Sequence, residues 1–237
     1  KGSIGKKYIK EKIIMKTALV IGSTGLIGSQ LVDILLESEH YQKVVIFVKR
    51  ESGKSHPKLE QHIINFDAPE TYQHLVKGDD LFCTIGTTIK KAGSQSAFRK
   101  VDYEYPIAFS KIAKTNKIKQ FLIVSSLGAN KDSNNFYLKT KGEMEAALAK
   151  ANFETTVIVR PSLLLGQRSE FRLGEKIGAF FMKGFSFLFF GKVKKYRPIE
   201  SSTVAKALYL LAQSNKKGYT IYESDELQNI GKQTTIN

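Results

Sequence analysis

Cysteine, tryptophan and proline are scarce in this chain of 237 residues, which contains one Cys, no Trp and five Pro. The single cysteine, Cys83, cannot form an internal disulfide, which fits a reducing compartment and leads us to expect a cytoplasmic protein. No apolar run reaches the roughly 18 residues that a membrane-spanning helix needs, so none is expected. No structural zinc site or other metal centre is expected either, because the four histidines are scattered: His40, His56, His62 and His74.

Acidic residues are also few, with 22 Asp and Glu against 37 Lys and Arg, and the formal net charge is +15. The lysines are spread along the chain, so we interpret most of this charge as ordinary surface lysine. The alternative is a field that attracts a phosphorylated ligand. Direct nucleic-acid binding is not expected, because no basic helix or aromatic-interleaved basic motif is present. Residues 1–14 are interpreted as a flexible basic tail, either a cloning remnant or an upstream extension.

Hydrophobic residues make up 42% of the chain, which excludes a disordered protein. Short β-branched runs alternate with longer amphipathic ones, and this predicts an α/β fold, a doubly wound parallel sheet with helices on both faces. Residues 15–237 are expected to form one Rossmann domain, with 161–237 contributing a small C-terminal cap. The predicted strands cover residues 17–21, 44–48, 62–65, 81–85, 121–124, 155–159 and 219–222. The predicted helices cover residues 26–36, 101–113, 139–151 and 203–213.

An apolar, aromatic stretch occupies residues 177–190. It is too short to span a bilayer. We interpret it as a helix packed on the domain. A substrate lid, or a surface that faces a membrane or a protein partner, is the alternative.

Three glycines, Gly22, Gly25 and Gly28, follow the first predicted strand and open the first predicted helix. Gly22 permits a sharp turn, Gly25 lets the backbone approach a pyrophosphate, and Gly28 lets the helix pack close to the strand. The helix N-terminus then offers free N–H groups to phosphate. This pattern predicts dinucleotide binding, and a simple tight turn is the alternative.

The second predicted strand is followed by Lys49 and Arg50, where the adenosine ribose lies in such folds. An acid there would bond the 2′-hydroxyl of NAD, whereas a cation accepts the 2′-phosphate of NADP. We therefore predict that NADP(H) is preferred over NAD(H), with two solvated surface cations as the alternative. Asp67 is a candidate partner of the adenine amino group or, equally, the N-cap of a helix that begins near Pro69.

Tyr137 and Lys141 lie four residues apart on one face of a predicted helix. A nearby ammonium favours the phenolate and lowers the pKa of a tyrosine, which suits proton transfer. Ser126 follows the fifth predicted strand, at the edge where parallel sheets bind ligands, and its hydroxyl can bond a substrate carbonyl. An ordinary surface pair and a turn serine are the alternatives. The order of glycine turn, serine and Tyr-x-x-x-Lys is far more specific than any one of them.

These residues resemble the short-chain dehydrogenase/reductase superfamily, in its atypical branch, and more narrowly the oxidoreductases related to the HIV Tat-interacting protein. The similarity runs from about residue 16 to residue 232. It is carried by the glycine turn and by segments 81–88, 91–93, 101–102, 125–131, 137–145, 160–165 and 227–232.

The resemblance implies a role for each matched residue. The dinucleotide phosphates would be lined by Thr24, Gly25, Leu26 and Ile27. The remaining cofactor contacts would come from Lys49 and Arg50 at the 2′-phosphate, Ile85 and Gly86 on the adenosine side, Leu164 at the nicotinamide end, and Arg172 from the cap. Tyr137 would donate and accept the proton, Lys141 would be its electrostatic partner and a ribose ligand, and Ser126 would anchor the carbonyl.

Two features depart from the family pattern. Asp102 stands where many short-chain dehydrogenases carry a catalytic Asn, and the aromatic stretch differs from the family in composition. The leading hypothesis is an NADP(H)-dependent oxidoreductase that acts on a carbonyl or alcohol substrate of apolar character. The alternative is a non-catalytic NADP(H)-binding sensor or interaction regulator, with protein partners or a homodimer. A sugar-nucleotide epimerase is disfavoured, because the stretch after Arg160 is short for a substrate lobe.

Overall fold

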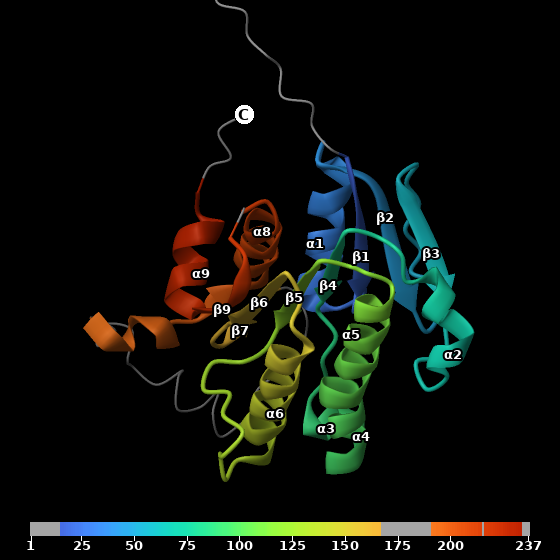
Figure 1. Ribbon diagram of the computed structural model, residues 1–237. Helices are drawn as coiled ribbons and strands as arrows, with labels where there is room; N and C mark the ends of the chain where they lie inside the picture. The colour runs from blue at the N-terminus through green and yellow to red at the C-terminus, as the bar shows by residue number, and fades with distance from the viewer. Residues whose placement is uncertain (1–14, 167–190, 215, 234–237) are drawn as a thin grey trace, which may run out of the picture.

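The computed structural model describes residues 15–166, 191–214 and 216–233 (Figure 1). In this part of the chain, seven strands form one parallel sheet in the order β3-β2-β1-β4-β5-β6-β9. Their bounds are β1 (Lys16–Ile21), β2 (Tyr41–Val48), β3 (Leu59–Ile63), β4 (Asp80–Cys83), β5 (Gln120–Val124), β6 (Thr155–Arg160) and β9 (Gly218–Glu223). The strand order reverses between β1 and β4, and ligands bind such sheets in the crevice outside the strand ends at this point. The predicted doubly wound parallel fold is confirmed.

Helices cover both faces of the sheet (Figure 1). One face carries α1 (Leu26–Glu37) and α8 (Ser201–Ala212), with α9 (Ser224–Gly231) packed against α8. The other carries α5 (Tyr105–Thr115) and α6 (Phe136–Ala151). Successive β1 residues alternate between the two cores, with Val20 on the α1 side and Ile21 on the α5 side. This explains why the central strands are apolar throughout rather than alternating with polar residues.

Several predicted strands have different bounds in the structure: β2 begins at Tyr41 rather than at residue 44, and β4 ends at Cys83 rather than at residue 85. The third was expected over residues 62–65, but β3 begins at Leu59 and ends at Ile63. It is an edge strand, and Ile63 is 57% exposed, so its polarity pattern identifies it poorly. The strand expected over residues 219–222 is β9, which pairs in parallel with β6 and completes the main sheet.

Most of the described elements after residue 160 belong to the main sheet and to the helices that cover it. β9 extends the sheet and α8 packs on α1, while β7 (Leu164–Leu165) and β8 (Ile199–Glu200) form a separate parallel pair. A short 3₁₀ helix, Gly191–Tyr196, precedes β8. The aromatic stretch 177–190 lies outside the described residues. Within the described ranges, no helix combines the length and the apolar character that crossing a membrane requires.

Candidate cofactor and active site

The glycine turn packs tightly against the backbone that follows β4. Gly22 has φ +83°, and a Cβ placed on it would lie 2.4 Å from the Ile85 nitrogen. A Cβ on Gly28 would lie 2.1 Å from the Gly22 carbonyl oxygen. The Thr84 hydroxyl donates to the carbonyls of Ile21 and Gly22, at 3.1 Å each. Side chains at Gly22 and Gly28 are therefore excluded by backbone packing.

The start of α1 suits a phosphate. Gly25 is its N-cap, so no side chain caps the helix, and the N–H groups that follow are available to an anion. The Ser23 hydroxyl is buried in the turn and has no hydrogen-bond partner among the described residues. Buried hydroxyls are rarely left unsatisfied, and an oxygen of a bound dinucleotide would satisfy this one. The residues present therefore fit the phosphates of a dinucleotide.

The other predicted phosphate residues take different positions around the turn. Thr24 is exposed. Ile27 is buried in the core below α1, so it can reach a phosphate only through its N–H. Leu26 is half-buried, and its side chain lies against Gly166, just beyond β7.

A cavity of about 230 Å³ opens beside the turn, between α1 and the loop after β2. Its lining residues are Ser23, Thr24, Ser29, Val32, Ile46, Ser52 and Lys54. The Lys54 ammonium forms an ion pair with Asp33 of α1, which holds this loop against the helix. The sequence reasoning missed Ser52 and Lys54. The Ser-Gly-Lys sequence, which follows the basic pair after one intervening acid, Glu51, is a signal that could have identified them.

The two predicted 2′-phosphate ligands diverge in space. The Lys49 ammonium lies 5.5 Å from the Tyr105 ring centroid and 5.9 Å from the Phe66 ring centroid, on the α5 side of the sheet. Arg50 is exposed and forms no ion pair within the described part of the chain. Of the two side chains, Lys49 contacts aromatic rings, whereas the Arg50 guanidinium has no ion-pair partner among the described residues.

Asp67 lies near Lys49 and is not a helix N-cap, because α2 (Pro69–Tyr72) is capped by Ala68. Its Oδ1 accepts from the Tyr105 hydroxyl at 2.8 Å and lies 2.9 Å from the Lys100 ammonium. These hydrogen bonds, the one from Lys100 foremost, hold the pKa of Asp67 below its ordinary value. Among the described residues nothing hydrogen-bonds Oδ2, which leaves an acceptor for the adenine amino group.

Tyr137 and Lys141 lie one turn apart at the start of α6. Asn135 caps this helix by accepting a hydrogen bond from the Leu138 nitrogen at 3.1 Å. The Tyr137 ring packs on Phe98, with centroids 5.4 Å apart. The Lys141 side chain is only 5% exposed, and its ammonium lies 2.7 Å from Oδ1 of Asp102.

Burial alone lowers the pKa of Lys141, but the charge and the hydrogen bond of Asp102 outweigh burial and raise it above its ordinary value. The ammonium is therefore charged at neutral pH. Its electrostatic partnership with Tyr137, one helical turn away, stays a prediction.

The loop after β4 connects the glycine turn to this pair. Ile85 lies against Gly22, and a Cβ on the next residue, Gly86, would be 3.3 Å from Asp102 Oδ1 and 3.9 Å from Lys141 Nζ. The resemblance implied that Ile85 and Gly86 back the adenosine side. In the structure, Gly86 lies beside the Asp102–Lys141 pair.

The two serines after β5 differ in their surroundings. Ser125 is buried and its hydroxyl donates to Glu145. Ser126 is half-buried, and the contact of its hydroxyl is a long one, 3.5 Å to the Leu127 carbonyl. Ser126 is thus the hydroxyl that a substrate carbonyl could engage. Leu164 is half-buried in β7, and Arg172 lies outside the described residues.

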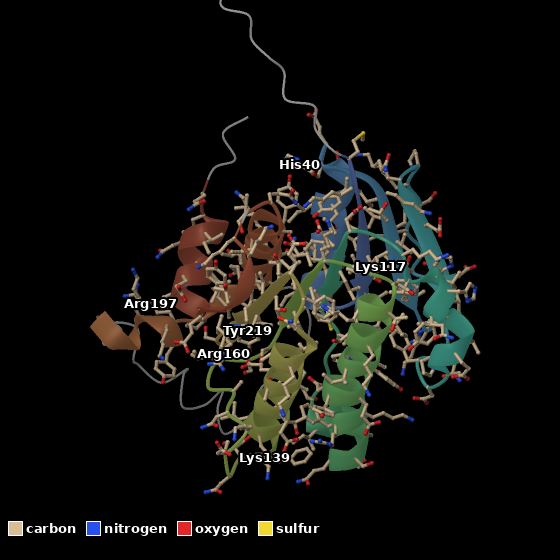
Figure 2. The ribbon with its side chains drawn as sticks, viewed as in Figure 1. His40, Lys117, Lys139, Arg160, Arg197 and Tyr219 are labelled. Atoms are coloured by element: carbon tan, nitrogen blue, oxygen red, sulfur yellow. The ribbon has the colours of Figure 1, made fainter. Side chains whose placement is uncertain are left out.

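An ionic network of Arg160, Glu145 and Glu223 lies where α6 meets β6 and β9. Arg160 donates to Glu145 through Nε at 3.0 Å and also through Nη2, and it lies 3.8 Å from Glu223. The Tyr219 hydroxyl donates to the Glu145 carbonyl at 3.5 Å. Figure 2 shows Arg160 close to Tyr219, with Lys139 at the start of α6 and His40 at the opposite end of the molecule.

Comparison with known proteins also indicates a dinucleotide-binding protein. Residues 22–184 match a family model described as NAD(P)H-binding. Protein FMP52, mitochondrial, of Debaryomyces hansenii is 39% identical over 158 residues, which cover 65% of this chain and 69% of that protein. The FMP52 protein of Eremothecium gossypii is 33% identical over 91% of this chain and 97% of its own. Protein HTATIP2 of Rattus norvegicus is 32% identical over 69% of each chain.

Solved structures share the fold at low sequence identity. The UDP-glucose 4-epimerase of Thermotoga maritima, crystallised with UDP-glucose, has a TM-score of 0.65 at 17% identity and covers 87% of this chain and 76% of its own. The enzyme WbmH of Bordetella bronchiseptica, in complex with NAD⁺, has a TM-score of 0.66 at 17% identity. The match covers 89% of this chain and 76% of the WbmH chain.

The expectation of a cytoplasmic protein is wrong, because relatives at 33–39% identity carry names that place them in mitochondria. A lone buried cysteine does not distinguish one reducing compartment from another. The resemblance drawn from the motifs is confirmed by the match to HTATIP2. With its parallel sheet, its glycine turn and its matched span, the chain belongs to the NAD(P)H-binding family and has a Rossmann-like fold, which it shares with the solved epimerase structure.

Proposed function

We propose that this protein is an NADP(H)-dependent oxidoreductase that moves hydride between the nicotinamide and a carbonyl or alcohol substrate. One observation carries the proposal. The glycine turn lies against Ile85, and the next residue, Gly86, lies against the ammonium of Lys141. This adjacency supports a single elongated ligand that serves both the phosphate cradle and the Tyr137–Lys141 pair.

Each residue of the pair has a chemical task. Bound NADPH supplies the hydride. Tyr137 donates a proton to the developing alkoxide and takes it back in the oxidation direction. Lys141, one helical turn from Tyr137, would be its electrostatic partner, and Ser126 would hydrogen-bond the carbonyl oxygen.

A preference for NADP(H) is supported by the charges around the end of β2. No acid occupies position 49 or 50, where a carboxylate would bond the ribose 2′-hydroxyl of NAD. Arg50 is exposed there, and Lys54 and Ser52 line the adjacent cavity. A guanidinium, an ammonium and a hydroxyl together suit a 2′-phosphate.

Parallel titrations with NADPH and NADH, followed by nicotinamide fluorescence, test the cofactor. The chain has no Trp, so the protein background is small. We expect tighter binding of NADPH than of NADH. Arg50→Ala and Lys54→Ala should each weaken NADPH binding about 10- to 150-fold and leave NADH binding unchanged, since a charge-assisted hydrogen bond contributes roughly 1.5–3 kcal/mol. Lys139→Ala, an exposed lysine on α6, is the control. Equal affinities for the two cofactors would contradict the preference.

Turnover is tested with a panel of apolar aldehydes and ketones, measured as NADPH consumption. Tyr137→Phe should lower kcat about 10²–10⁴-fold with NADPH binding intact, because only the proton donor is removed. Tyr209→Phe on α8 is the matched control. NADPH binding by the wild-type protein without turnover of any substrate would overturn the enzyme proposal in favour of a cofactor-binding sensor. UDP-glucose is tested separately by product analysis, because epimerisation consumes no net NADPH, and its conversion to an epimer would indicate an epimerase instead.

We also propose a mitochondrial location, on the names of the FMP52 relatives. Subcellular fractionation of the source organism, with an antibody against the purified protein, tests it. Recovery outside the mitochondrial fraction would refute it.

A further inference from the structure

The ion pair between Asp102 and Lys141 is the most buried one among the described residues, with side chains 1% and 5% exposed. The carboxylate is held at both oxygens. Oδ1 lies 2.7 Å from the Lys141 ammonium, and Oδ2 accepts from the Thr87 nitrogen at 2.8 Å. The Asp102 carboxylate therefore connects the loop after β4, through Thr87, to α6, which carries Lys141 and Tyr137.

A distortion of the helix brings Asp102 to this position. Gln95 to Thr115 run as α4 (Gln95–Arg99), a π-helical turn (Lys100–Glu104) and then α5. Asp102 is the central residue of the π turn and its buried acid. A π turn adds a residue to the helical repeat, and such turns are frequent at functional sites. An uninterrupted helix was predicted over residues 101–113, because nothing in the apolar spacing indicates the extra residue.

Lys141 needs a counter-ion to remain charged where it lies. An ammonium removed from water loses solvation that a paired carboxylate restores in part. The groups that face it are Asp102, the Tyr137 hydroxyl and the Cys83 thiol. Burial raises the pKa of Cys83 to about 12, so this thiol is neutral at physiological pH. The neighbouring Glu143 is occupied by Arg99, in an ion pair that is more exposed.

We propose that Asp102 is the positioning residue of this site: aimed inward by the π turn, its carboxylate keeps the buried Lys141 ammonium charged and directed toward Tyr137. The catalytic part of this inference rests on the proposed oxidoreductase function, whereas the pairing itself does not.

The stability of the cofactor-free protein gives a test with a definite sign. In the wild type, the pKa of Lys141 is raised above 10.5, so its stabilisation is full below that pH and is lost as the pH rises through the raised pKa. In Asp102→Asn, burial remains and the counter-ion is gone, so the pKa of Lys141 falls below 10.5. The unfolded chain then binds the extra proton, and stability rises with pH between the lowered pKa and 10.5.

The measurement is the folding equilibrium constant from urea unfolding at several pH values between 7 and 10. Asp132→Asn is the control, since it removes the charge of an exposed carboxylate. Relative to this control, the folding constant of Asp102→Asn should rise by up to about tenfold for each unit of increase in pH. This is the slope expected when the unfolded chain binds one proton more than the folded chain. Lys141→Met in the same background should abolish the slope. A loss of stability that is equal at every pH would overturn the proposal.

Asp102→Asn could instead leave too little stability to measure. In that case Lys141→Met, added to the same chain, should restore folding, because it removes the unpaired buried charge. Failure of the double variant to fold better than Asp102→Asn would overturn the proposal as well.

A second readout separates this inference from the proposed function. If Asp102→Asn folds, its kcat should decline as the pH rises and Lys141 loses its proton, and Asp102→Glu should restore part of the wild-type profile. A kcat lowered by the same factor at all pH values would contradict the catalytic role. A wild-type protein that shows the stability effect but neither binds NADPH nor turns over substrate would refute the proposed function and leave the pairing established.

Discussion

Replacing Gly22 by alanine should destabilise the protein far more than replacing another left-handed glycine. Gly22 and Gly53 have φ values of +83° and +72°, so alanine at either position incurs the left-handed penalty of about 1–2 kcal/mol. No heavy atom lies within 4 Å of a Cβ on Gly53. At Gly22 the added Cβ would lie 2.4 Å from the Ile85 nitrogen and 2.5 Å from the Thr84 carbonyl carbon. Both are backbone atoms that cannot move unless the end of β4 moves with them.

The steric part adds roughly 1–3 kcal/mol, as overpacking in a filled interior does. Gly22→Ala should therefore lower the unfolding free energy by about 2–5 kcal/mol, against about 1–2 kcal/mol for Gly53→Ala. The difference of about 1–3 kcal/mol corresponds to a Tm lower by roughly 2–12 °C in a protein of this size. Urea and thermal unfolding of the two variants measure it directly.

Cofactor binding provides an independent readout of the same change. Displacement of Ile85 and Gly86 disturbs both the turn and the neighbourhood of Lys141, so Gly22→Ala should bind NADPH weakly at temperatures where it is still folded. Gly218→Ala, at the start of β9, should bind NADPH like the wild type, because Gly218 has φ +90° and nothing lies within 4 Å of an added Cβ. Equal stabilities for Gly22→Ala and Gly53→Ala would refute the argument that backbone packing, rather than φ alone, requires glycine at position 22.

The remaining predictions concern buried groups. Glu145→Gln should lower the unfolding free energy by about 3 kcal/mol, because it leaves the Arg160 guanidinium short of its buried partner, whereas Glu154→Gln, at the exposed pair with Lys217, should leave stability nearly unchanged. Urea unfolding compares the two, and equal losses would contradict the importance of burial. Cys83 should resist thiol reagents at pH 8 until the protein is denatured, because it is buried and its pKa is raised to about 12. Rapid labelling of the native protein would show that β4 is accessible.

Much of the site was predictable because its signals are local. The glycine spacing, the strand before it and the helix after it lie within one short segment, and the packing of Gly22 and Gly28 accounts for the pattern. The i, i+4 spacing of Tyr137 and Lys141 also needs only an α-helix to bring the two together. Boundaries were poorest at the edge strand β3, where one exposed flank weakens the apolar pattern.

What local pattern does not encode is the direction of a side chain relative to distant elements. Lys49 turned toward Phe66 and Tyr105 rather than toward the cavity, while Lys54, unnoticed in the sequence, lines it. The position of β9 beside β6 likewise depends on pairing between strands far apart in the chain.

The sequence by itself determined the order of the seven strands of the main sheet and of the long helices α1, α5, α6 and α8, the glycine turn and the family, because apolar periodicity and glycine spacing are local properties of the chain. Tertiary structure alone decided that Asp102 meets Lys141, since the two residues belong to different helices and a π turn re-aims the carboxylate. It also decided which cations surround the end of β2. The physical reason is that a buried charge is stable only beside a partner, and that partner is supplied by packing between separate elements.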